Sequence, residues 1–440
     1  MTKICKLLIA LLSVVMIFNV TGCAVAPTDD TLADNPAEDD LKSNLQTDTL
    51  AAGSSDLMTT ITSNAIEGLQ PDANFVNNIA DFSIDLFKKS ISDSENALVS
   101  PISVVLALAM TANGAQGDTL NQMEQLLGGN IPLQELNKFL YSYTAALPNT
   151  EKSKFHIANS IWIRDDSKRL QVNPVFLQKN ADYFNAAAFI AAFDDQTVQD
   201  INNWVNTNTD GMIDSIIEEI DSLSMIFLIN AITFDAEWET IYDEFSVGDG
   251  NFTDVTGTTN TVSFMHSTES IFIDDGLATG FAKPYADGGF SFVAMLPNDD
   301  VSLYEYIESL TGEHFINMIQ NAESTTVITA MPKFDFDFTI DMNEALITLG
   351  MPDAFDDVKA DFNEMAVSTD GNLYISQVLH KTFISVDESG TRAGAATSVA
   401  IAGTSAPLEM KYVTLDRPFV FAIIDNATGL PMFIGTVLIV

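Results

Sequence analysis

Residues 386–407 read VDESGTRAGAATSVAIAGTSAP and differ in composition from the rest of the chain. Between Glu388 and Glu409 the only charged residue is Arg392, although the chain carries 61 acidic residues. Starting at Thr391, alternate positions hold Thr, Ala, Ala, Thr, Val and Ile, the period of a strand with one face on a core. Gly, Ala and Ser are nevertheless poor strand formers. The pattern predicts a segment able to be a loop or a buried strand, and a plain surface loop is the simpler alternative.

Strand patterns lie on both sides of this segment. Residues 225–232 (MIFLINAI) are continuously apolar, as in a central strand covered on both faces, whereas 334–340 (FDFDFTI) alternate, which leaves one face in water. Residues 419–424 and 432–440 flank a turn-rich stretch and predict a hairpin. Helical periodicity is concentrated earlier, at 75–90, 101–110, 118–127 and 197–205. Together these elements predict one interwoven α+β unit.

Composition excludes several classes of function. The chain has 440 residues, 47% of them hydrophobic, which is enough for a full-sized core. Its formal net charge of −42 argues against a nucleic-acid partner, because phosphate binding requires a basic patch. The sequence has only four histidines and lacks the GxSxG, HExxH, P-loop, GxGxxG and CxxC motifs. We therefore expect neither an enzyme nor a metal or cofactor site.

The N-terminus has the pattern of an export signal. Two lysines precede an apolar run of about 14 residues, which is too short to span a bilayer but suits a signal peptide. Small residues then lead to Cys23. This site resembles that of bacterial lipoproteins, which implies removal of residues 1–22 and lipidation of Cys23. Ala24 follows instead of Asp, which favours the outer membrane in a two-membrane bacterium. An ordinary secretory signal with a stray cysteine is the alternative.

Residues 23–71 are rich in Asp, Thr, Ser, Ala and Asn. This composition predicts a flexible acidic tether, with a loosely attached helix around residues 56–69 as the alternative. A domain at 72–440 would follow. We therefore expect the domain at the cell envelope, outside the cytoplasm and bound to the membrane through lipid on Cys23.

Blocks spread over residues 72–440 resemble the serpin family. Residues 381–391 (KTFISVDESGT) resemble the strand that leads into the family's reactive-loop hinge, and 96–103 (NALVSPIS) resemble the start of the helix under its main sheet. Further blocks occur in family order at 158–162, 201–205, 228–234 with Trp238, 332–334, 349–351 with 354–355, and 416–419 with 425–429. The resemblance implies an α+β serpin fold with three β-sheets, eight or nine helices and an exposed reactive-centre loop.

The resemblance also implies a suicide inhibitor of serine proteases. In this family the protease cuts the loop, remains attached as an acyl-enzyme, and is distorted when the loop inserts into the main sheet, a known example of strand addition. Inhibitory members share a small, uncharged hinge free of proline, and Thr391 would be its first inward residue. Arg392 departs from the usual acidic residue but would face outward. The hinge residues are Glu388, Gly390, Thr391, Arg392, Ala393, Gly394, Ala395, Ala396 and Thr397.

The family's spacing from Gly390 places the cleaved bond between Thr404 and Ser405, with Ile401 or Ala402 as alternatives. No Arg or Lys lies nearby, which disfavours trypsin-like targets. A small Thr404 favours elastase-like or subtilisin-like proteases. The expected partner is therefore a serine protease bound covalently to a monomeric inhibitor.

Five further residues match family positions that would control insertion. Ser100, Ser103, Asn230 and His380 match a buried polar cluster where the main sheet opens, and Trp238 matches the point where the loop first enters. Their role would be structural. The first alternative is a non-inhibitory serpin that acts as a cell-surface binding module. The second is a hydrolase, against which the missing nucleophile motifs argue.

Overall fold

In the computed structural model, the strands predicted before the small-residue segment (386–407) lie in one sheet and the hairpin predicted after it lies in another. The structure describes residues 53–129, 131–165, 170–221, 224–369, 372–391 and 410–440. Within these ranges the chain builds three sheets of seven, nine and two strands, all inside a unit that spans residues 50–440. The signal at 1–22, Cys23, the hinge residues 392–397 and the Thr404–Ser405 bond lie outside the described residues.

The seven-stranded sheet has the order β1–β5–β3–β6–β15–β14–β12. Its strands are β1 (Ser54–Asp56), β5 (Ala187–Ala191), β3 (Ser153–Arg164), β6 (Ile226–Glu237), β15 (Gly390–Thr391), β14 (Ile375–Val386) and β12 (Phe334–Asp341). The central strand predicted at 225–232 is confirmed as β6, which is buried along most of its length. The alternation predicted at 334–340 is also confirmed, because exposed and less exposed side chains alternate along β12.

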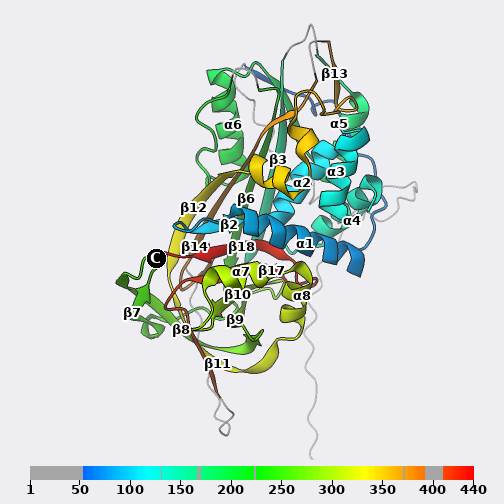
Figure 1. The fold of residues 1–440 in the computed structure, drawn as a ribbon. Helices are drawn as coiled ribbons and strands as arrows, with labels where there is room; N and C mark the ends of the chain where they lie inside the picture. Colours follow the sequence, from blue (N-terminus) through cyan, green and yellow to red (C-terminus); the bar gives the residue numbers. More distant parts are fainter. Residues whose placement is uncertain (1–52, 130, 166–169, 222–223, 370–371, 392–409) are drawn as a thin grey trace, which may run out of the picture. The chain divides into compact units, whose positions relative to one another are not determined.

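Helices cover both faces of this sheet near β6 (Figure 1). Helix α2 (Pro101–Ala112) packs against β3 and β6, and all its residues are buried because other helices lie on its far side. Helix α6 (Asp195–Asn208) covers the opposite face, where Ile201 and Val205 pack with Phe227 and Ile229. The remaining helices of the sheet's surroundings are α1 (Ala73–Ser90), α3 (Gly117–Gly128), α4 (Leu133–Ala146) and α5 (Pro174–Phe184). Two covered faces explain why β6 is buried along most of its length and carries apolar side chains on both faces.

The nine-stranded sheet has the order β16–β11–β8–β9–β10–β17–β18–β2, with β7 paired to β8. The predicted hairpin is confirmed as β17 and β18, although β18 ends at Val437. The strands are β16 (Lys411–Thr414), β11 (Glu323–Pro332), β8 (Thr259–Asp274), β9 (Ala278–Pro284), β10 (Phe290–Pro297), β17 (Phe419–Asp425), β18 (Pro431–Val437), β2 (Ala97–Val99) and β7 (Val247–Thr253). The other elements are α7 (Leu303–Ser309), α8 (Gly312–Gln320), α9 (Asn343–Leu349), the short 3-10 helices η1 (Glu244–Ser246) and η2 (Pro352–Phe355), and the small sheet of β4 (Leu170–Val172) and β13 (Ala366–Ser368).

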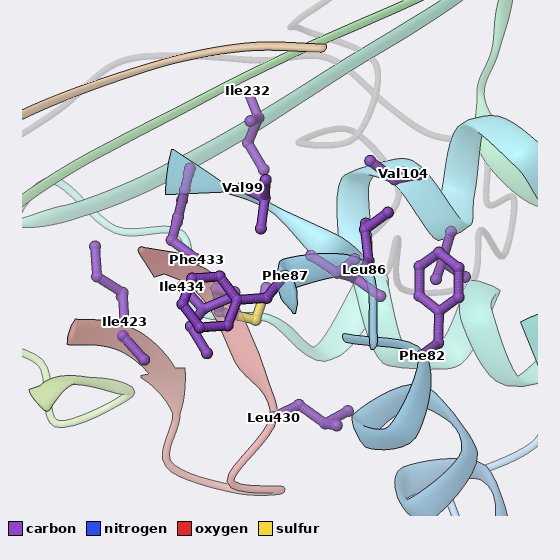
Figure 2. Close-up of a cluster of buried hydrophobic side chains, with 14 of the residues drawn as sticks. Phe82, Leu86, Phe87, Val99, Val104, Ile232, Ile423, Leu430, Phe433 and Ile434 are labelled. Atoms are coloured by element: carbon purple, nitrogen blue, oxygen red, sulfur yellow. The ribbon is translucent and has the colours of Figure 1, made fainter. Parts of the chain in front are cut away.

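The main core joins the two large sheets. Figure 2 shows Phe87 of α1 near Val99 of β2 and Phe433 of β18, and Phe82 of α1 and Ile232 of β6 belong to the same cluster. Each fully buried side chain of this size contributes roughly 1.5–3 kcal/mol to folding. Among the described residues, no helix has both the length and the apolar character needed to cross a membrane.

The folded unit begins earlier than the sequence indicates. Residues 54–71, assigned above to the tether, lie on the domain: β1 pairs with β5, and the Asn64 and Leu69 backbone amides donate to Asp182 Oδ1 and to the Lys138 carbonyl. The alternative helix does not form either, because the chain after β1 runs without regular structure to residue 72. A few apolar residues such as Leu57 attach this stretch to the core, and in a polar background they leave little trace in the composition.

Candidate functional site

The candidate site is the seam between β6 and β14. At one end, which we call the closed end, Ile375–Lys381 of β14 pairs in parallel with Ile226–Ala231 of β6. Beyond this point the short strand β15 lies between the two, so that Thr391 pairs with Ala236 on one side and with Val386 on the other. The seam is therefore closed at one end and already holds two residues of the small-residue segment at the other.

A tight turn connects β14 to β15, and we call residues 387–391 the hinge turn. The Asp387 backbone amide donates to the Gly390 carbonyl at 3.0 Å. The Asp387 carboxylate accepts from the backbone amides of Ser389 and Gly390 at 2.8 and 3.2 Å. An Asp side chain that bonds its own backbone two residues later favours such a turn. The turn reverses the chain, so β15 runs antiparallel to both neighbours.

Thr391, which the sequence predicts to face inward, is buried. Thr391 is 2% exposed, and its hydroxyl lies 2.5 Å from that of Tyr285 on the strand-end after β9. Glu388 lies at the surface and forms an ion pair with Lys333. The hydrogen bond from Lys333 lowers the pKa of the Glu388 carboxyl below its ordinary value. The small hydroxyl side chain of Thr391 therefore lies on the inner face of the seam, and the charged carboxylate of Glu388 lies at the surface.

Trp238, at the end of β6, holds the hinge turn from one side. Its backbone amide donates to the Ser389 carbonyl and its indole Nε1 donates to the Asp387 carbonyl, both at 2.9 Å. The Trp238 ring stacks on Tyr285, with ring centres 4.6 Å apart and an interplanar angle of 12°. The Tyr242 backbone amide adds a third bond, to the Glu388 carbonyl at 2.9 Å. The residue matched to the point where the loop enters therefore contacts the hinge directly.

The four residues of the predicted sheet-opening cluster meet at the closed end. His380 of β14 lies beside Asn230 of β6, and its ring nitrogen Nδ1 is 2.5 Å from Asn230 Oδ1. The Ser100 backbone amide donates to His380 Nε2 at 3.1 Å, and Asn230 Nδ2 donates to Ser103 Oγ. Ser100 and Ser103 come from the start of α2. The cluster therefore joins the two strands of the seam to the helix beneath them.

Burial keeps the His380 imidazole neutral. The side chain is completely buried, and desolvation lowers the pKa of His380 from 6.5 to about 3. A neutral ring can accept a hydrogen bond from the Ser100 backbone amide at Nε2 and donate one from Nδ1–H to Asn230 Oδ1, which matches both contacts. The arrangement is suited to hold the strands together.

Sequence reasoning missed several residues of the seam. Asn159 of β3 lies next to Asn230 in the sheet and accepts a hydrogen bond from it at 2.5 Å. Lys333 and Asn159 both lie in blocks that resemble the family, but the resemblance assigns them no role. Tyr242 and Tyr285 had no signal in the sequence beyond being aromatic. Their contacts with the hinge turn join residues that are far apart along the chain, which no local pattern records.

Comparisons with known proteins agree with this geometry. The family model described as Serpin (serine protease inhibitor) matches residues 77–439. The leukocyte elastase inhibitor of Xenopus tropicalis is 30% identical over 371 residues, which cover 80% of this chain and 96% of the relative. The crystal structure of tengpin, a thermophilic serpin, in the native state is 54% identical, with a TM-score of 0.85 over 88% of this chain and 100% of that one. The structure of tengpin in the latent state, also 54% identical, has a TM-score of 0.75 over 84% and 99%.

Proposed function

Since the chain belongs to the serpin family of protease inhibitors, we propose that it is a suicide inhibitor of elastase-like or subtilisin-like serine proteases. The observation that supports this most directly is β15, which lies between β6 and β14 with Thr391 buried. A strand that continues from Thr391 needs no new turn, because the hinge turn is already formed.

The first step of the proposed mechanism is an ordinary attack on a peptide bond. The protease serine Oγ adds to the carbonyl carbon of Thr404, and the bond from this carbon to the nitrogen of Ser405 breaks. The nitrogen takes up a proton and becomes a free amine, while an ester remains between Thr404 and the protease serine. No cofactor or metal takes part. A second step, hydrolysis of this ester, would release the protease unless insertion comes first.

In the second part of the mechanism, the residues after Thr391 extend β15 along the seam. Positions 393, 395 and 397 hold Ala, Ala and Thr and follow Thr391 on the inward face, so only small side chains have to enter first. Val399 and Ile401 come later and each gain about 1.5–3 kcal/mol when buried. Each new ladder hydrogen bond adds about 0.5–1.5 kcal/mol. The protease, still joined at Thr404, moves with the inserted strand.

The closed end has to part for this to happen. Extension of β15 separates Lys381 from Ala231 first, and then His380 from Asn230. We propose that the cluster of Ser100, Ser103, Asn230 and His380, with Asn159, sets the resistance to this step. Its bonds are replaceable, because an inserted backbone can offer donors and acceptors to the polar groups it separates.

The N-terminal pattern supports a place for the inhibitor at the cell envelope. We propose that Cys23 carries lipid and that the protein works there as a monomer against proteases outside the cytoplasm. Replacing Cys23 with Ser should release the protein into the soluble fraction of fractionated cells. Retention of the Cys23→Ser protein in membranes would point to another anchor.

The experiment that tests inhibition is a denaturing gel of the purified protein mixed with an elastase or a subtilisin. We expect a band at the sum of the two masses that resists SDS, and a released peptide that begins at Ser405 in mass spectrometry. Clean cleavage without the heavy band, and without a rise in thermal stability after cleavage, would overturn the proposal in favour of a binding module. A large rise in thermal stability without the band would show that insertion works and that the target protease is a different one.

A further inference from the structure

A buried lysine next to the hinge has no part in the mechanism proposed above. Lys283 of β9 is 2% exposed, and its Nζ lies 2.8 Å from Glu269 Oε1 of β8, which is also nearly buried. Lysine is rarely buried to this degree unless it is paired. A buried ion pair is weak evidence for added stability, because desolvation of both charges offsets their attraction. The position of this pair therefore needs another explanation.

The lysine contacts one short segment of backbone and rings. Lys283 Nζ donates to the Thr240 carbonyl at 3.1 Å. It also lies 4.4 Å from the centre of the Tyr242 ring and 5.4 Å from that of Trp238, within the range of cation–π attraction. The ammonium group thus holds residues 238–242 at three points.

The same segment holds the hinge turn. The backbone amides of Trp238 and Tyr242 donate to Ser389 and Glu388, and the Trp238 indole donates to Asp387. On the other side, Ser267 Oγ donates to Glu269 Oε1 at 2.5 Å and lies 2.8 Å from the Thr329 hydroxyl of β11. A continuous set of contacts therefore runs from the nine-stranded sheet through Lys283 to the hinge turn.

We propose that Lys283, fixed by Glu269, is a positioning residue for loop insertion. It holds residues 238–242 so that the hinge turn stays formed and serves as the starting point of the inserted strand. Ordering a stretch of backbone costs conformational entropy. If the hinge turn is already ordered before insertion begins, this cost does not slow the first step of insertion. Insertion then starts faster and competes better with hydrolysis of the ester. This inference rests on the proposed suicide inhibition and names a residue that tunes it.

The test compares Lys283→Met with the unchanged protein. Methionine keeps a long apolar stem but removes the charge and the bond to Thr240. We expect the amides of Trp238 and Tyr242 to exchange with deuterium about tenfold faster, which corresponds to about 1.4 kcal/mol. We also expect the stoichiometry of inhibition of an elastase to rise, because more molecules are cleaved as substrates. Glu269→Gln, which keeps the side chain's size, should move both values in the same direction and serves if Lys283→Met does not fold.

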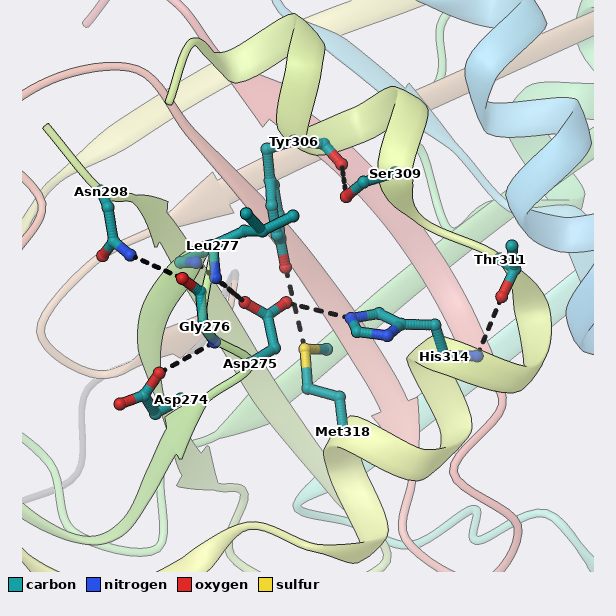
Figure 3. A network of polar contacts seen from close by, with 11 residues as sticks. Asp274, Asp275, Gly276, Leu277, Asn298, Tyr306, Ser309, Thr311, His314 and Met318 are labelled. Atoms are coloured by element: carbon teal, nitrogen blue, oxygen red, sulfur yellow. Dashed lines mark hydrogen bonds and ion pairs between the residues drawn. The ribbon is translucent and has the colours of Figure 1, made fainter. Parts of the chain in front are cut away.

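A control pair lies beside the same sheet. His314 Nε2 is 3.2 Å from the Asp275 carboxylate just after β8, and Figure 3 shows this contact among α7, α8 and the chain after β8. His314→Met removes a basic partner from a buried carboxylate without touching residues 238–242. We expect it to change neither the exchange at the hinge turn nor the stoichiometry.

Two outcomes separate this inference from the function on which it rests. If Lys283→Met and Glu269→Gln unfold more easily but keep the exchange rates and stoichiometry of the unchanged protein, the pair is only structural and the inference is wrong. If the unchanged protein forms no SDS-resistant complex with any protease, inhibition itself fails. The exchange measurement, which needs no protease, then still decides whether Lys283 holds the hinge turn.

Discussion

The two ends of the seam between β6 and β14 are held by different kinds of contact. At the closed end the strands pair directly, and side chains of Asn230 and His380 bond to each other and to α2. At the other end the strands are separated by β15, and the hinge turn is held by main-chain bonds from Trp238 and Tyr242. This difference gives insertion a direction. Because β15 already lies between β6 and β14 at one end, it can lengthen only towards the closed end, where it must separate the two strands.

The largest expected effect comes from a charge at the start of β15. Thr391→Arg places a guanidinium where the native side chain is 2% exposed. A buried charge without a partner costs several kcal/mol, of the order of 3–5, so the end of the seam that holds β15 should reject it. We expect the variant to be cleaved as a substrate, with at least about a hundredfold less SDS-resistant complex.

The control for this variant is Thr60→Arg, which adds the same charge at an exposed position on the N-terminal stretch. It should leave the yield of complex on a denaturing gel unchanged. Normal inhibition by Thr391→Arg would show that β15 is not the start of the inserted strand. Insertion would then not proceed from β15 towards the closed end.

A smaller but still large effect is expected at the closed end. His380→Ala leaves the Ser100 amide and the Asn230 oxygen without their partner and opens a cavity. We expect a loss of about 2–5 kcal/mol in the free energy of unfolding, measured by thermal or urea denaturation. His266→Ala, at an exposed position, should change it little. Equal losses in the two variants would mean that the closed end is held by its backbone ladder alone.

The pH dependence of stability tests the same histidine without a cavity. Burial lowers the pKa of His380 from 6.5 to about 3, so below pH 6.5 the unfolded chain binds a proton that the native protein does not. Stability from this group is present above pH 6.5 and falls as the pH drops towards 3, by about 1.4 kcal/mol per unit. The unchanged protein should therefore lose its advantage over His380→Gln as the pH falls from 7 to 4. A constant difference over this range would mean that His380 titrates normally and is not sealed from water.

The sequence predicted best what depends on neighbours along the chain. The apolar run of β6, the alternation of β12 and the hairpin of β17 and β18 each follow from a local period. The fold class and the sheet-opening cluster came from family blocks, and the structure brings the four cluster residues together. Thr391 was placed inward by its period of two, and it is buried.

What the sequence could not predict depends on partners far away. Thr391 meets Tyr285 across 106 positions, and Asn159 joins the cluster from a strand 71 positions before Asn230. Residues 54–71 look like a tether because they are polar, but β1 completes the edge of β5 and Ser54 bonds to the buried Asp200. Each of these hydrogen bonds joins two polar groups that are far apart along the chain. Neither residue therefore stands out from its neighbours in the sequence.

The smallest expected effect concerns the surface of the hinge turn. Glu388 is 44% exposed and Lys333 30% exposed, and exposed ion pairs contribute about 0–1 kcal/mol because water and salt screen them. If main-chain bonds hold this end of the seam, Glu388→Gln should lower the free energy of unfolding by less than about 1 kcal/mol, and high salt should remove the difference. Lys359→Gln, which breaks exposed pairs with Asp353 and Asp356, is the matched control and should behave alike. A much larger, salt-resistant loss in Glu388→Gln alone would mean that the ion pair, rather than Trp238 and Tyr242, keeps the hinge turn in place.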